Sequence, residues 1–185
     1  MHDMAKKITF NLSASSVRKA QKELLKYKKD LLMKCQKFTE RLAAKGILVA
    51  QQNVGEFGKY IVFSAETSQT ENGAKTILYA TNTGLIKSQW VTEEGIQEAD
   101  VSPILMAEFG SGLRADNTRG KKMPVPMGTG TFPEQTHAED PNGWWYMDLN
   151  EEWHHSYGVR PSMPMWNAAN EIFDQIRTTA KEVFG

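Results

Sequence analysis

The sequence has a single cysteine and no long apolar run, and both absences restrict what the protein can be. Because Cys35 is alone, an internal disulfide and a zinc site built from several cysteines are excluded. No stretch approaches the roughly 18 to 20 consecutive apolar residues that a membrane-spanning helix needs. Residues 1–7 also lack the apolar segment of a signal peptide. We therefore expect a soluble protein, made in a cytoplasm, with no membrane as its partner.

The motifs that mark common catalytic sites are also missing. No histidine stands in an H-E-x-x-H motif, and His154 and His155 would point to opposite faces of a strand. The glycines around Ser111 form no nucleotide-binding or phosphate-binding loop, and no nucleophile elbow surrounds that serine. Asp140, Asp148, Glu151 and Glu152 could supply paired carboxylates for acid-base catalysis or for a nuclease metal, but acidic turns are far commoner. We expect no enzyme activity, no metal, no cofactor and no small-molecule substrate.

Length and composition favour one globular domain. The chain has 185 residues, of which 40% are apolar and 24% are charged. Domains usually hold about 100 to 150 residues, so residues 1–185 fit a single domain with a long arm or loop. The apolar share is far from the composition of disordered chains and can supply a core.

The net charge of zero conceals an asymmetry along the chain. Residues 1–46 contain ten Lys and two Arg against two Asp and two Glu, which is a net charge of +8, so the other 139 residues carry −8. A basic first quarter is compatible with a solvated helix, with packing between subunits, or with nucleic acid or lipid. Since the compensating charge lies in the same chain, head-to-tail packing of identical subunits would neutralise both parts.

A long basic helix is predicted over residues 13–46, after a flexible arm at 1–12. Ser13 to Ser16 provide N-cap candidates, and neither Pro nor Gly interrupts the chain before Gly46. Apolar residues recur every seven positions and on the flanks of that series, at Val17, Leu24, Leu31 and Phe38, and at Ala20, Tyr27, Cys35 and Leu42. Such a helix would extend about 50 Å, whereas a compact chain of this size is about 40 Å across.

The helix must therefore break, or part of its stripe must be covered by something outside the subunit. A coiled coil is the competing explanation, although Lys34 and Arg41 stand at flanking positions where a zipper needs apolar residues.

The remaining segments predict an α+β fold, with the long helix and a C-terminal helix packed on a small antiparallel sheet. Short β-branched and aromatic runs predict strands over 47–100, including 47–50, 60–63, 76–80 and 85–91, with a polar link at 66–75 and a tight turn at 82–84. Capping residues predict a short helix at 101–110. Residues 111–143 form a long loop, functional or a disordered insertion. An aromatic hairpin follows at 144–158 and an amphipathic helix at 164–184.

Three segments of the carboxyl-terminal half together resemble a known family. They are Glu108-Phe109-Gly110-Ser111-Gly112, the start of the hairpin at Trp144-Trp145-Tyr146, and Arg160-Pro161-Ser162-Met163-Pro164-Met165-Trp166-Asn167-Ala168-Ala169. Their order and spacing are similar to those of the gene-product-ten family of long-tailed bacteriophages, which are tail-component or neck proteins. The resemblance is best over residues 100–185 and extends, by order of elements, over the basic helix and the hairpins.

The resemblance implies a non-enzymatic virion protein at the head-to-tail junction, assembled in the cytoplasm of the bacterial host. There an oligomeric ring completes the tail and joins it to the head. The implied partners are further copies of the chain, connector or stopper proteins, and tail-terminator or tail-tube proteins, with genomic DNA passing through the channel. The resemblance implies structural roles for the motif residues, namely Glu108, Phe109, Gly110, Ser111, Gly112, Trp144, Trp145, Arg160, Pro161 and Pro164.

The pattern of charged and apolar residues also gives candidate subunit contacts, which are Leu24, Leu31 and Phe38 in the helix and Arg114, Lys121 and Lys122 in the loop. The alternative is a nucleic-acid-binding module that uses the basic helix and the loop. Salt-dependent retention on DNA, lost when lysines of the helix are neutralised, would favour that alternative; the lysines are Lys26, Lys28, Lys29 and Lys34.

Overall fold

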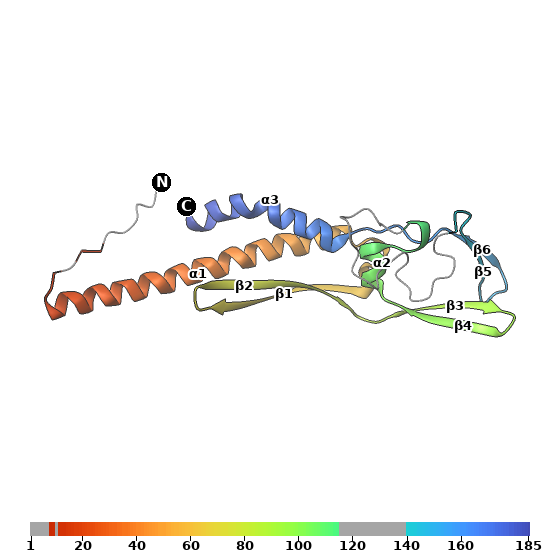
Figure 1. Cartoon of the computed structure of the whole chain (residues 1–185), viewed down its shortest axis with the longest axis horizontal. Helices are drawn as coiled ribbons and strands as arrows, with labels where there is room; N and C mark the ends of the chain where they lie inside the picture. Colours follow the sequence, from red (N-terminus) through yellow and green to blue (C-terminus); the bar gives the residue numbers. More distant parts are fainter. Residues whose placement is uncertain (1–7, 10, 115–139) are drawn as a thin grey trace.

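The computed structural model describes residues 8–9, 11–114 and 140–185, and it confirms the α+β class (Figure 1). The elements in chain order are α1 (Ala14–Asn53), the 3-10 turn η1 (Gly55–Tyr60), β1 (Ile61–Thr70), β2 (Gly73–Asn82), β3 (Ile86–Thr92), β4 (Gly95–Val101), α2 (Pro103–Phe109), η2 (Gly112–Arg114), β5 (Trp144–Met147), β6 (Trp153–Ser156) and α3 (Pro164–Phe184). The molecule is elongated, with α1 lying between α3 and the β1–β2 hairpin.

The strands form two sheets, so the prediction of one sheet is wrong. The first sheet is the hairpin β1–β2, and the second has the order β4-β3-β5-β6. Residues 82–84 do not turn β2 back onto β3, because the end of β2 is fixed elsewhere. The Asn82 side chain donates to Ser102 Oγ at 2.9 Å and accepts from the Ile104 N–H at 3.0 Å. Asn82 thereby fixes the start of α2, and the chain leaves towards the second sheet.

The helix α1 continues to Asn53, so the predicted helix end at Gly46 and the predicted strand at 47–50 are wrong. Gly46 is buried where α1 meets both α3 and β2. A Cβ at this position would lie 2.6 Å from Ile172 Cδ1 and 3.1 Å from Leu78 Cδ1. The glycine is there for close packing and does not end the helix. Its intrinsic helix penalty of about 1 kcal/mol is offset by the packing on both sides.

The predicted polar link at 66–75 is also wrong, because β1 and β2 run through it. Thr70 is paired with Gly73, which leaves Glu71 and Asn72 as a two-residue turn. Side-chain hydrogen bonds hold this polar part of the hairpin against α1. The Thr67 and Thr76 hydroxyls are 2.8 Å apart, and Thr76 donates to the Thr39 hydroxyl at 2.8 Å. Polar cross-strand pairs therefore continue the ladder where the apolar pattern ends.

The core lies where α1, α2, α3 and β1 meet, and it is built largely from small residues. Ala50 and Ala107 are fully buried and Ala168 is 1% exposed, and the cluster includes Val54, Ile61 and Phe63. Since alanine allows close approach of the backbones, three helices and a strand can converge at this point.

The elements of the carboxyl-terminal half lie close to their predicted bounds. α2 begins after Ser102, whose hydroxyl accepts from the Leu105 N–H, and it ends at Gly110 with a φ of +71°. The aromatic hairpin β5–β6 joins the second sheet through the alignment of Met147 with Val91. The predicted arm and long loop are described only in part, since residues 1–7, 10 and 115–139 lie outside the described residues.

Candidate functional site

Glu108 joins α2 to the start of α3. Its side chain is buried, and Oε2 accepts from the Met165 N–H at 2.9 Å while Oε1 accepts from the Trp166 N–H at 3.1 Å. The N-cap residue of α3, Met163, supplies no side-chain cap. A carboxylate from another helix thus caps the amino end of α3, where the helix dipole also favours a negative charge.

The entry to α3 is fixed by further bonds to the backbone of α2. The N–H groups of Ser162 and Met163 both donate to the Ala107 carbonyl, at 2.8 and 2.9 Å. The Ser162 hydroxyl is 3.3 Å from the Val54 carbonyl and 3.3 Å from that of Ala107. These bonds hold Met163 in the left-handed region, at a φ of 57°. Pro164, buried, then occupies the first turn of α3, while Pro161 is half-buried and Arg160 is exposed.

Residues 110–112 and 158–159 are hydrogen-bonded to each other, and we call this pair of backbone segments the clasp. Its close approach depends on glycine. Ser111 N–H donates to the Val159 carbonyl at 2.9 Å, and the Ser111 hydroxyl accepts from the Val159 N–H at 3.0 Å. A Cβ on Gly110 would lie 2.3 Å from the Val159 carbonyl oxygen, and one on Gly158 would lie 2.0 Å from the Ser111 oxygen. Two backbone segments therefore approach more closely than any residue with a side chain permits.

The same clasp reaches the aromatic hairpin. Gly112 faces the indole of Trp144, because a Cβ there would lie 2.6 Å from Trp144 Cζ3. Phe109 is half-buried at the end of α2, whereas Trp145 is 63% exposed and packs on His155 with ring centroids 4.6 Å apart. Most motif residues are thus brought together as a structural junction between the helices and the second sheet. Sequence reasoning missed Ala107 and Gly158, and it gave no role to Ser162, which lies within the third motif segment. The contacts of Ala107 and Ser162 use the backbone or a common hydroxyl.

The turn between β5 and β6 contains a group with the side chains of a metal site. One ligand atom each of Asp148, Glu152 and His154 lies within 4.8 Å of the others. The carboxylate of Asp148 is already used, however. Its Oδ1 accepts from the N–H groups of Asn150 and Glu152 at 2.9 and 3.0 Å, and its Oδ2 is hydrogen-bonded to His154 Nε2 at 3.0 Å. We interpret the group as a carboxylate that closes the hairpin turn.

This turn should open in acid, at a lower pH than a free carboxylate would require. The Glu152 N–H, followed by the His154 ring, stabilises the carboxylate and lowers the pKa of Asp148 from 3.8 to about 2. A lowered folded-state pKa means that the stabilisation is complete above pH 3.8 and is lost as the pH falls through about 2. NMR titration of the Asn150 and Glu152 amides should show a midpoint near the lower value.

Asp148→Asn should abolish this amide titration, whereas Glu151→Gln, in the same turn, should leave it unchanged. An amide midpoint at the ordinary carboxyl value in the unmodified protein would contradict the role given to Asp148.

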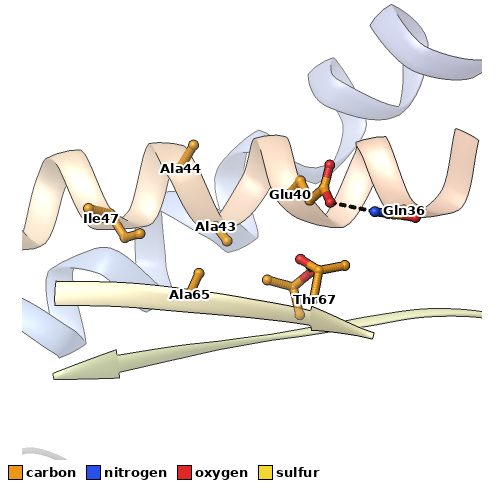
Figure 2. Close-up of a pocket in the computed structure, with 8 residues that line it drawn as sticks. Gln36, Glu40, Ala43, Ala44, Ile47, Ala65 and Thr67 are labelled. Carbon is orange, nitrogen blue, oxygen red and sulfur yellow. Dashed lines mark hydrogen bonds between the residues drawn. The ribbon is translucent and has the colours of Figure 1, made fainter. Parts of the chain in front are cut away.

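A shallow groove of about 450 Å³ lies between α1 and the β1–β2 hairpin (Figure 2). Its described lining residues are Gln36, Glu40, Ala43, Ala44, Ile47, Ala65, Thr67 and Thr76. The Glu40 carboxylate accepts a 2.8 Å hydrogen bond from the Gln36 amide, and the threonine hydroxyls bond to one another. This lining contains no nucleophile beside a base, so we interpret the groove as a packing seam and not as a catalytic pocket.

The amino-terminal half of α1 extends past the β1–β2 turn and past the C-terminal end of α3 (Figure 1). We call residues 14–35 the α1 arm. Its apolar row follows a three-four spacing and forms the arm stripe, namely Val17, Ala20, Leu24, Tyr27 and Leu31. Ala20 is buried, but Leu24, Tyr27 and Leu31 are 55%, 57% and 41% exposed. The arm carries seven Lys or Arg against two acidic residues, a net charge of +5. A basic helix whose row of large apolar side chains is exposed presents a contact surface.

The other candidate subunit contacts have different surroundings. Phe38 is half-buried and packs on Phe184 with ring centroids 5.7 Å apart, so α3 of the same chain already covers it. Arg114 is exposed and lies 5.8 Å from the centroid of the Tyr157 ring. Lys121 and Lys122 lie outside the described residues.

The outer face of α3 is a second exposed apolar surface, and sequence reasoning missed it. Ile172 faces Gly46 of α1, whereas Phe173 and Ile176 are 75% and 42% exposed. Adjacent residues of a helix point about 100° apart, so Phe173 can be exposed although Ile172 faces α1. The signal was a second three-four row, which we call the α3 row and which consists of Trp166, Ala169, Phe173, Ile176 and Ala180.

Within the described parts of the chain, we find no helix that combines the length and the apolar content needed to cross a membrane. A comparison of the chain with protein families, curated proteins and solved structures finds no match.

Proposed function

We propose that this chain is a non-enzymatic structural protein of a bacteriophage neck. In this proposal, copies of the chain form an oligomeric ring that completes the tail and joins it to the head. The partners are connector or stopper proteins on one side and tail-terminator or tail-tube proteins on the other, and genomic DNA passes through the channel. The protein would act in the virion, after assembly in the host cytoplasm.

The α1 arm is the observation that carries this proposal. A helix of 40 residues is about 60 Å long, and its amino-terminal half holds Leu24, Tyr27 and Leu31 exposed, away from the core. Exposed apolar side chains in a row favour protein contact, because burying each one stabilises an interface by roughly 1 to 3 kcal/mol. A chain with a basic arm and an acidic remainder also suits contacts between unlike surfaces of identical subunits, which close into rings.

The motif residues support the same proposal through the resemblance to the neck proteins. The Glu108 carboxylate and the Ser111 hydroxyl accept hydrogen bonds from backbone N–H groups of the same chain. Their roles in the junction are mechanical, as the resemblance implies.

Phage particles made without this protein should be separate filled heads and separate tails, which negative-stain electron microscopy would count. Supplying the gene in trans should restore joined virions to the level of the parent phage. Joined, infectious virions in normal number without the protein would overturn the proposal.

A nucleic-acid-binding module is the second candidate, and the exposure of the arm lysines is the observation that favours it. Lys26, Lys28, Lys29 and Lys34 are all exposed. If the arm bound DNA, a plot of the logarithm of the binding constant against the logarithm of the salt concentration would have a negative slope. Neutralising these four lysines would make that slope smaller by about 3 to 4. The neck proposal expects the same retention as for a control with four exposed lysines neutralised elsewhere, at Lys59, Lys75, Lys87 and Lys181.

A further inference from the structure

Two apolar rows on this chain have the same spacing, and the large side chains of both rows are exposed. The arm stripe and the α3 row each contain five residues, separated by three, four, three and four positions. Each row is therefore about 21 Å long at 1.5 Å per residue. A three-four spacing is the pattern by which one helix packs its side chains between those of another.

The large side chains of each row are left exposed for a different reason. The arm stripe lies on α1 before the point where α3 begins to cover it, and it continues in register into Phe38, which packs on Phe184. The α3 row lies beside the face of its helix that contacts α1 through Gln175 and Thr179, and Phe173 and Ile176 of the row remain 75% and 42% exposed. Because the α1 arm extends past the C-terminal end of α3, its stripe lies beyond the reach of the α3 row of the same chain.

From these observations we infer that the arm stripe of one copy docks on the α3 row of a second copy. This inference rests on the proposed ring and names the two surfaces that form it. Since each copy offers one of each surface, the contact is between unlike surfaces, which gives a ring where the rotation between copies closes.

Charge distinguishes this pairing from the alternatives. Two arms packed on each other would bring net charges of +5 together, which opposes their association. The α3 helix has two basic and three acidic residues, a net charge of −1, so it attracts the arm, whereas a second arm would repel it.

Crosslinking between single-cysteine variants tests the docking. In a Cys35→Ser background, we would make Leu24→Cys in one preparation and Phe173→Cys in another, both at exposed positions whose replacement leaves the core intact. The two full-length proteins, of which one is tagged, are mixed and treated with a bismaleimide crosslinker. The crosslinker is long enough to join the two thiols whether the helices pack parallel or antiparallel. Far-ultraviolet circular dichroism checks that each variant is folded.

We expect a heterotypic Leu24→Cys to Phe173→Cys product roughly tenfold or more above that of a control mixture, because the contact raises the effective concentration of the second thiol. The control replaces Leu24→Cys by Lys22→Cys, which is exposed and lies about 160° around the helix from Leu24. A heterotypic yield no higher than the control, or an excess of Leu24→Cys homodimers, would overturn the inference.

This experiment is separable from the test of the neck proposal. If heads and tails fail to join without the protein, yet the heterotypic product stays at the control level, the neck role stands and the docking surfaces are wrong. If the heterotypic product forms while virions without the protein are normal, the docking stands and the neck role is wrong.

Discussion

Replacing Gly158 by alanine should lower the free energy of unfolding by about 4 kcal/mol or more. Gly158 has a φ of +92°, a region that residues with a side chain rarely adopt. A Cβ there would lie 2.0 Å from the backbone oxygen and 2.6 Å from the backbone carbon of Ser111. Because both contacts are to backbone, no side-chain rotation can relieve them.

The clasp between residues 110–112 and 158–159 must then separate, which also removes the hydrogen bonds between Ser111 and Val159. Urea unfolding followed by tryptophan fluorescence measures the effect, since Trp144 and its neighbours lie beside the clasp. Gly84→Ala is the matched control, because a Cβ at Gly84 meets nothing within 4 Å and its φ is not in the left-handed region. We expect the control to stay within about 0.5 kcal/mol of the parent. Equal midpoints for Gly158→Ala and the parent would contradict the clasp.

Sequence reasoning located elements whose ends are marked by local chemistry. Ser102, Pro103 and Gly110 delimit α2 with a cap, a first-turn proline and a left-handed glycine, and all three act within one or two turns of the helix. It misplaced the end of α1, because the same residue type at Gly46 serves a contact with Ile172, far away in the sequence. A glycine that ends a helix and one that admits a neighbour look alike until the neighbour is known.

The division into two sheets has the same kind of origin. Nothing near residues 82–84 shows that Asn82 will hydrogen-bond to Ser102 and Ile104 and so prevent β2 and β3 from pairing. The junction was predictable only in part. Glu108 and Ser111 stood out by resemblance, but their partners are backbone groups at residues 159, 165 and 166, and a backbone group can form such a bond whatever its side chain is. The α3 row, by contrast, was readable from its spacing.

Glu108→Ala should destabilise the protein by about 3 kcal/mol, because two backbone N–H groups lose a charged acceptor in a buried place. The carboxylate is 8% exposed and accepts from the N–H groups of Met165 and Trp166, the second and third residues of α3. Removing it also leaves the positive end of the α3 dipole without its negative partner. Glu108→Gln keeps one acceptor oxygen but no charge, so it should lower the free energy of unfolding by about half as much as Glu108→Ala.

Urea unfolding gives the order of stability, which should be parent, Glu108→Gln, then Glu108→Ala. Hydrogen exchange adds a local measurement, in which the amides of Met165 and Trp166 should exchange faster in both variants. Glu94→Ala, at an exposed glutamate in the β3–β4 turn, should change the stability by no more than about 0.5 kcal/mol. If Glu108→Ala matched that control, the cap would contribute nothing to the position of α3. Because α3 presents the row proposed to receive a neighbouring arm, loss of the cap should also weaken the heterotypic crosslink between Leu24→Cys and Phe173→Cys, even where the fold survives.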